Sequence, residues 1–327
     1  MAILTVIEAV RQALAEELRR DPDVFILGED IGKRGGVFLA TQGFVDEFGP
    51  ERIIDTPLAE SSIAGIAMGA AMQGMRPVAE IQFADFIWPA MNQVVGEAAR
   101  ARYGTNGGVH VPMVVRCPYG GHVRGGLFHS QSVEAYFAHT PGLKVVAPAT
   151  PYDVKGLLKA AIRDDDPVVF LEHKRTYRSV RGETPDEEYV IPIGVADVKR
   201  KGVDATLVTY GLTVHYALQA AEVLSQEGAE VEVVDLRTIR PLDTETVLES
   251  VRKTSRVLIV HEDNRTGGIG AEVSAQIVEG AFADLDAPVM RCTGPDVPAM
   301  PFAPTLEAAF MPTADKIADA LRRLLEY

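Results

Sequence analysis

The chain has 327 residues, of which 47% are hydrophobic and 24% charged, an ordinary composition for a globular protein of about two domains. Its 46 acidic residues outnumber 32 lysines and arginines, and the net charge of −14 argues against binding to a nucleic-acid backbone. No uncharged apolar run reaches the roughly 18–20 residues of a membrane span, and the N-terminus lacks the apolar block of a signal peptide. The two cysteines lie far apart and suit a reducing compartment. We therefore expect a soluble, cytoplasmic protein.

In the first half of the chain, strands are predicted to alternate with helices. A capping box between Thr5 and Glu8 predicts a first helix that ends before Asp21. Uniformly apolar runs predict buried strands at 24–27, 52–55, 78–83, 113–116, 143–147 and 168–172. Helical spacing predicts helices at 61–74, 88–103, 133–138 and 152–163. This alternation indicates a mainly parallel sheet that is covered on both faces.

The polar segment 179–204 predicts a domain boundary, which we place between residues 190 and 191. The second domain, 191–327, repeats the α/β pattern. Its predicted strands are 206–210, 231–236, 257–260 and 289–292, and its predicted helices are 214–227, 244–253, 271–282 and 314–325. The fold class is therefore two α/β domains with mainly parallel sheets.

Glu60 is the first candidate site residue. It follows a turn and directly precedes a charge-free helical run, so its carboxylate is expected at the edge of a core. One interpretation is an acid stabilised at a helix N-terminus, and the other is a functional acid; the residues alone leave both open. Within the run, Gly65 and Gly69 indicate a close helix contact, either inside the domain or between subunits.

Three further features carry alternatives that the residues alone do not decide. The tract Gly120–Gly126 lacks the lysine of a phosphate-binding loop and is more typical of a mobile active-site loop. His129 follows it, either as an acid, base or anion partner or as an exposed loop histidine. The turn Asp164–Asp166 is a solvated connection or a cation site. Standard nucleotide fingerprints and common hydrolase motifs are absent.

Seven ordered motifs together resemble one family nearly from end to end. They read GEDIGKRGGVF, IIDTPLAE, RPVAEIQFADF, GGLFHSQS, TPGLKVV, AIRDDDPVVFLE and VVDLRTIRPLD. The family is the beta subunit of the thiamine-diphosphate-dependent, decarboxylating component of 2-oxo acid dehydrogenase complexes. The resemblance implies a pyrimidine-binding domain, a transketolase-type C-terminal domain and assembly into α2β2 heterotetramers.

The resemblance also implies roles for individual residues. Glu60 would bond the aminopyrimidine ring nitrogen of the cofactor, and Leu58, Gln82 and Phe86 would line that pocket. Relatives often carry tyrosine where this chain has Phe86, so any contact through a hydroxyl is lost here. His129 would face the substrate carboxylate and the incoming lipoyl group.

Metal and partner expectations follow from the same resemblance. Relatives bind a structural potassium ion where this chain has the Ala161 carbonyl, Asp164 and Asp166. The superfold holds Mg²⁺ and the cofactor diphosphate on a GDG motif, which this sequence lacks. An alpha subunit is therefore expected to supply both, and the chain alone is expected to be inactive.

Substrate and partner assignments rest on the same motifs. EIQFADF and HSQS are closer to the branched-chain (2-oxoisovalerate) type than to the pyruvate type, with pyruvate and acetoin as alternatives. The acyl group would pass to the lipoyl acyltransferase core of the complex. Two rival hypotheses remain. The missing GDG motif disfavours a self-sufficient transketolase-like enzyme, and the intact Glu60, Gln82 and His129 disfavour a non-catalytic partner-binding subunit.

Overall fold

The computed structural model describes residues 1–327 as two compact units. Unit 1 comprises Met1–Tyr119 and Tyr136–Ile193, and unit 2 comprises Gly120–Ala135 and Gly194–Tyr327. The chain thus enters unit 2 briefly in its first half, a detour that the sequence did not predict. Among its helices, none is both long and apolar enough to cross a membrane.

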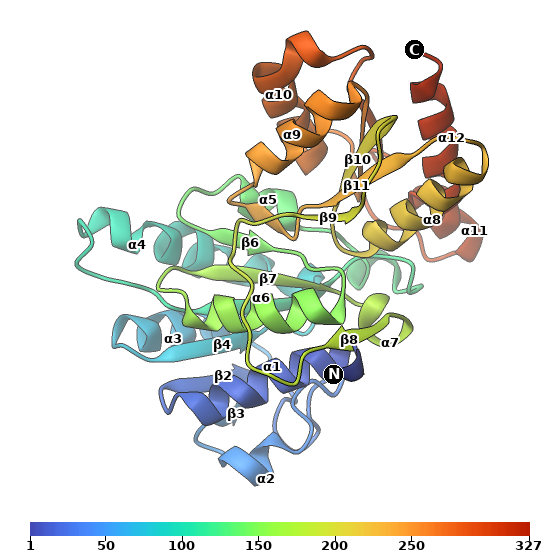
Figure 1. The fold of residues 1–327 in the computed structure, drawn as a ribbon. Coiled ribbons are helices and arrows are strands. Elements are labelled where there is room, and N and C mark those ends of the chain that lie inside the picture. Colours follow the sequence, from blue (N-terminus) through green and yellow to red (C-terminus); the bar gives the residue numbers. More distant parts are fainter. The chain divides into compact units, whose positions relative to one another are not determined.

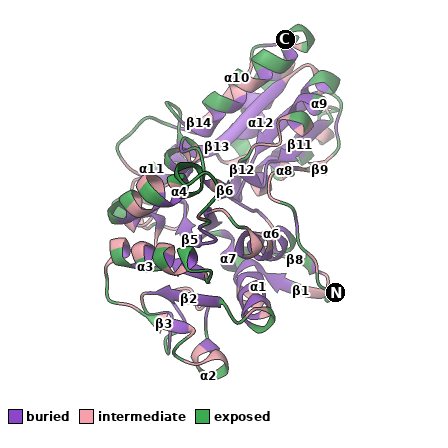
Figure 2. Cartoon of the chain, turned by 90° about the vertical axis from the view of Figure 1, so that its left-hand side faces the viewer, coloured by how far each residue is buried: buried purple, intermediate pink, exposed green.

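Unit 1 is built on a parallel sheet (Figure 1). Its strands follow the order β6 (Lys144–Val146), β7 (Val168–His173), β5 (Val114–Tyr119), β4 (Arg76–Glu80), β2 (Val24–Gly28) and β3 (Ile53–Asp55). Every residue of β2, β5 and β7 is buried, as a sheet covered on both faces requires (Figure 2). The predicted parallel α/β arrangement is confirmed for this unit.

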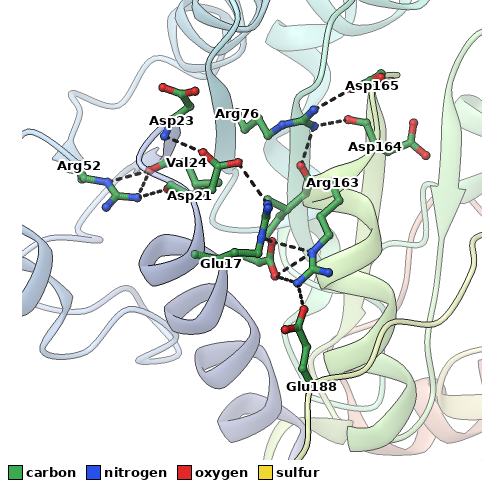
Figure 3. Close-up of polar contacts among 12 residues, drawn as sticks. Glu17, Asp21, Asp23, Val24, Arg52, Arg76, Arg163, Asp164, Asp165 and Glu188 are labelled. Carbon is green, nitrogen blue, oxygen red and sulfur yellow. Dashed lines mark hydrogen bonds and ion pairs between the residues drawn. The ribbon is translucent and has the colours of Figure 1, made fainter.

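Two helices, α1 (Val6–Arg20) and α6 (Pro151–Arg163), lie side by side on one face of this sheet, and α3 (Glu60–Met72) covers the other (Figures 1 and 2). The predicted capping box is present, because the Thr5 side chain accepts from Glu8 and Glu8 reaches back to the Thr5 amide. Near the C-terminal ends of α1 and α6, the fully buried Glu17 carboxylate accepts from Arg163 at 2.6 Å (Figure 3). This charge-assisted contact fixes the pair of helices.

The predicted continuous helix 88–103 is wrong in detail. The chain instead forms a 3₁₀ turn η2 (Trp88–Ala90), a π-helical segment η3 (Asn92–Ala98) and a short α4 (Ala99–Gly104). Pro89 lacks an amide hydrogen, which favours a break at the start of the run.

The remaining elements of unit 1 are short: β1 (Ala2–Thr5), α2 (Phe44–Phe48), η1 (Ala84–Phe86), α7 (Thr176–Ser179) and β8 (Arg181–Thr184), with β1 and β8 paired antiparallel.

Unit 2 has a second sheet, in the order β14 (Met290–Gly294), β13 (Val257–Asn264), β10 (Ala205–Thr209), β11 (Val231–Asp235) and β9 (Asp197–Arg200). The first four strands are parallel and β9 is antiparallel. Helices α8 (Leu212–Gln226) and α12 (Ala314–Leu325) cover one face, and α9 (Thr244–Thr254) and α10 (Ile269–Ala281) the other (Figure 1). Shorter elements are η4 (Gly126–Phe128), β12 (Thr238–Arg240), η5 (Phe282–Asp284) and α11 (Pro304–Phe310), while α5 (Glu134–Ala138) begins in unit 2 and ends in unit 1. The predicted strands and helices of this half are confirmed within a few residues, whereas β9, β12, η5 and α11 were not predicted.

Candidate active site

Glu60 is the first residue of α3, where helix backbone amides have no intrahelical acceptor. Its side chain is 9% exposed. Ala59 is the N-cap and offers no side-chain cap, and the Glu60 carboxylate forms no hydrogen bond or ion pair inside the chain. A nearly buried carboxyl group with no internal partner is suited to a hydrogen bond from a ligand.

Glu29 is a residue that sequence reasoning missed. It lies directly after β2, at the C-terminal edge of the parallel sheet, where ligands of open α/β sheets bind. Burial, and then the nearby charge of Glu60, raise the pKa of the Glu29 carboxyl. The sequence signal was weak, because an acid in a Gly-Glu-Asp turn is usually solvated.

Gln82 lies close to the same carboxyl pair. Its amide nitrogen approaches the Glu29 main-chain carbonyl at 3.5 Å, so the structure gathers Glu29, Glu60 and Gln82 at one edge of the sheet. Phe86 lies at the end of η1, and its ring centroid is 5.7 Å from that of Phe83 in a T-shaped pair. Leu58 is 78% exposed and therefore has no place in the core of unit 1. An amide and two carboxyl groups gathered at one edge suit a ligand that carries nitrogen donors, and the lining of the same pocket by Leu58 and Phe86 stays a prediction.

A buried ion network supports the strands that end at this edge. The Arg116 guanidinium of β5 contacts Glu80, the last residue of β4, and pairs with both oxygens of Glu172 on β7. Tyr177 donates to Glu172 at 2.6 Å. All four side chains are at most 2% exposed, and burial raises the pKa of Glu80 despite the charge of Arg116. The network links three neighbouring strands.

His129 belongs to unit 2 and is partly exposed. It directly follows η4, and its amide donates weakly to the Gly126 carbonyl at 3.4 Å. The backbone turns tightly here: a Cβ on Gly125 would lie 2.7 Å from the His129 carbonyl oxygen. The predicted glycine-rich active-site loop is therefore a defined loop of unit 2.

The turn predicted to bind potassium is already contacted by basic side chains. Lys144 donates to both carboxylate oxygens of Asp164 at 2.6 Å and lies 3.4 Å from Asp166. Arg76 donates to the Asp164 main-chain carbonyl at 2.9 Å (Figure 3). The Ala161 carbonyl accepts from the Asp164 amide at 3.3 Å.

Asp166 is paired in the same way. Partial burial opposes ionisation, but the hydrogen bond from Arg102, at 2.7 Å, and the charge of Lys144 lower the pKa of this carboxyl. No group of three or more histidine, cysteine or acidic side chains is placed to hold a metal ion. The potassium site at this turn stays a prediction.

Comparison with known families assigns both halves of the chain. Residues 3–180 match the pyrimidine-binding domain of transketolase, and residues 194–317 match the transketolase C-terminal domain. Among solved structures, the chain resembles one described as "Split gene transketolase, inactive beta4 tetramer", with a TM-score of 0.80 and 25% identity over 99% of this chain and 98% of that one. The predicted fold class is confirmed.

Curated relatives match over the whole length of both chains. The 2-oxoisovalerate dehydrogenase subunit beta of Bacillus subtilis (strain 168) is 58% identical over 327 residues. The pyruvate dehydrogenase E1 component subunit beta is 48% identical in the same organism and 46% identical in Staphylococcus epidermidis (strain ATCC 12228). On this likeness and on the two domain matches, the chain belongs to the family of beta subunits of the thiamine-diphosphate-dependent E1 component of 2-oxo acid dehydrogenases.

Proposed function

We propose that this chain, together with an alpha subunit, decarboxylates a branched-chain 2-oxo acid such as 2-oxoisovalerate and transfers the acyl group to a lipoyl domain of the acyltransferase core. The observation that carries the proposal is Glu60, a nearly buried carboxyl group with no partner in the chain, at the start of α3 in a pyrimidine-binding domain. The branched-chain preference is supported by 58% identity to the 2-oxoisovalerate relative, against 48% to the pyruvate relative of the same organism.

Thiamine diphosphate, when bound, supplies the electron sink that decarboxylation of a 2-oxo acid needs. The part of this chain is to hold and polarise the aminopyrimidine ring. The Glu60 carboxyl group holds a proton at the ring nitrogen, in surroundings where water competes little for that hydrogen bond. Gln82 and the apolar side chains of Leu58 and Phe86 orient the ring, and His129 meets the substrate carboxylate.

The proposed enzyme is an α2β2 heterotetramer in which the cofactor is shared. This chain has no GDG motif, so the alpha subunit brings Mg²⁺ and the grip on the diphosphate. The solved structure described as a split-gene transketolase in an inactive beta4 tetramer supports such a division of the site. The potassium ion at Ala161, Asp164 and Asp166 is a further part of the proposal, tested by comparing thermal unfolding in K⁺ with that in Na⁺.

The deciding experiment measures decarboxylation with thiamine diphosphate and Mg²⁺, by the chain alone and after co-expression with its alpha subunit. We expect activity only in the mixture. Activity of the chain alone would contradict the shared site. An inactive mixture that nevertheless assembles and binds the cofactor would favour the rival hypothesis of a non-catalytic subunit.

A further inference from the structure

The glycine-rich segment Gly120–Gln131, here called the His129 loop, is a closed loop within unit 2. Its two ends meet, because the Gly120 amide donates to the Gln131 carbonyl at 3.0 Å. Such closed loops have little regular structure to stabilise them and depend on contacts with the scaffold. The backbone at His129 is therefore held in place by whatever holds this loop.

One buried carboxylate binds the loop on both sides of its closure. A single oxygen of Glu262, on β13, accepts from the Gly121 amide at 2.8 Å and from the Ser132 hydroxyl at 2.9 Å. Glu262 is 4% exposed and belongs to an interior strand of the sheet of unit 2. Hydrogen bonds to a charged acceptor are stronger than neutral ones, especially away from water. The loop is thereby fastened to the most rigid part of its unit.

A second buried carboxylate binds the middle of the loop, at Arg124. Arg124 has φ +58°, a left-handed conformation that residues other than glycine rarely adopt. Its amide donates to Glu307 of α11 at 2.9 Å, and Glu307 is 2% exposed. The strained backbone is retained because this bond satisfies an amide that the loop itself leaves without an acceptor.

Two contacts of the Gln131 side chain hold the part of the loop that carries His129. The Gln131 side chain donates to the Leu127 carbonyl at 3.1 Å and accepts from the Met300 amide at 3.1 Å. His129 lies between Leu127 and Gln131 in sequence, and its own amide bond is weak at 3.4 Å. The contacts at the two ends and in the middle of the loop therefore limit where the backbone at His129 can lie.

We propose that Glu262 and Glu307 are positioning residues, which fix the His129 loop and so place His129 for the reaction. The structural part stands on the hydrogen bonds described above. The link to catalysis rests on the proposed function.

Amide hydrogen exchange of the full-length chain tests the structural part without any activity. The variants are Glu262→Ala and Glu307→Ala, each with its glutamine counterpart, which keeps an acceptor oxygen at the same reach. Glu279→Ala, the removal of an exposed acid on α10, is the control. We expect the amides of residues 121–131 to exchange at least about tenfold faster in the alanine variants, with a clearly smaller increase in the glutamine variants and none in the control.

Two outcomes would overturn the inference. One is unchanged exchange of the loop in both alanine variants. The other is faster exchange throughout β10 and β13, because the carboxylates would then hold the unit rather than the loop.

Kinetics of the complex with the alpha subunit test the second part. We expect the alanine variants to lose at least about tenfold in kcat/KM for the 2-oxo acid, the glutamine variants to regain most of it, and the midpoints of the pH profile to stay unchanged. Failure of the glutamine variants to restore kcat/KM would overturn a positioning role. An inactive wild-type complex whose loop exchanges as expected would refute the proposed function alone.

Discussion

At the scale of single residues, Glu60 carries the most specific prediction. Glu60→Ala removes the carboxyl group, and Glu60→Gln keeps its size and its place at the start of α3 while removing its ability to hold a proton. We expect each variant to lose at least roughly 100-fold in decarboxylation rate of the complex, the low end for removing a proton-transfer group. Assembly with the alpha subunit and the unfolding temperature should change little, and a rate near that of wild type would contradict the catalytic role.

Two neighbours on β13 respond to pH in opposite directions. Burial, reinforced by the charge of Arg291, lowers the pKa of His261 to about 4, and burial raises the pKa of Asp263 to about 6. The contribution of His261 to the free energy of unfolding therefore decreases as the pH falls from 6.5 towards 4, because the unfolded chain takes up the proton first. The contribution of Asp263 to the free energy of unfolding increases as the pH falls from about 6 towards 3.8, because the folded chain takes up the proton first.

Asp263→Asn should expose the effect of His261. Between pH 7 and pH 4 we expect the free energy of unfolding to fall more steeply in the variant than in wild type, by a difference on the order of 2 kcal/mol. Urea unfolding at several pH values measures it. Asp284→Asn, which alters an exposed acid, is the control, and parallel curves for Asp263→Asn and wild type would disprove the opposing pair.

At the scale of elements, two glycines with nearly the same positive φ angle differ in what surrounds them. Gly74 has φ +97° and Gly142 has φ +95°, so alanine is strained to a similar degree at both. A Cβ on Gly142 would lie 1.9 Å from the Ala99 carbonyl oxygen, whereas Gly74 has nothing within 4 Å. Gly142 therefore permits a close approach of two backbone segments, and Gly74 only a turn.

The matched pair gives a prediction for stability. Gly74→Ala should cost about 1–2 kcal/mol, the strain of a left-handed residue. Gly142→Ala should cost at least about 3 kcal/mol more, because the carbonyl must move or the chain must distort. Urea unfolding of the full chain compares them, and equal losses would show that the contact with Ala99 yields easily.

The elements also show what the sequence could and could not predict. Apolar strands and amphipathic helices were predictable because their periodicity reflects burial that the sheet imposes. The 3₁₀ turn Trp88–Ala90 and the π-helical segment Asn92–Ala98 were not, since both depend on tertiary packing that overrides local propensity. Likewise Glu60 stood out by its isolation before a charge-free helix, whereas Glu29 became visible only through its proximity to Glu60.

At the scale of the whole molecule, substrate choice is the property to test. The complex should decarboxylate 2-oxoisovalerate with a higher kcat/KM than pyruvate, in line with the greater identity to the branched-chain relative. A panel of 2-oxo acids at equal concentrations of enzyme measures the ranking. Decarboxylation of pyruvate as fast as that of 2-oxoisovalerate would refute the branched-chain assignment and favour the pyruvate type.

The fastening of the His129 loop has a consequence for how the chain folds. The loop contacts residues 141 and 183 positions further along the chain, at Glu262 and Glu307. Contacts of such long separation form late, since closing long stretches of chain costs entropy before any bond is gained. During synthesis, these anchors emerge from the ribosome after the loop and all of unit 1. The segment that bears His129 is therefore expected to be among the last parts of a newly made chain to reach its folded conformation. In a chain truncated before Glu307, this segment would lack one of its two anchors.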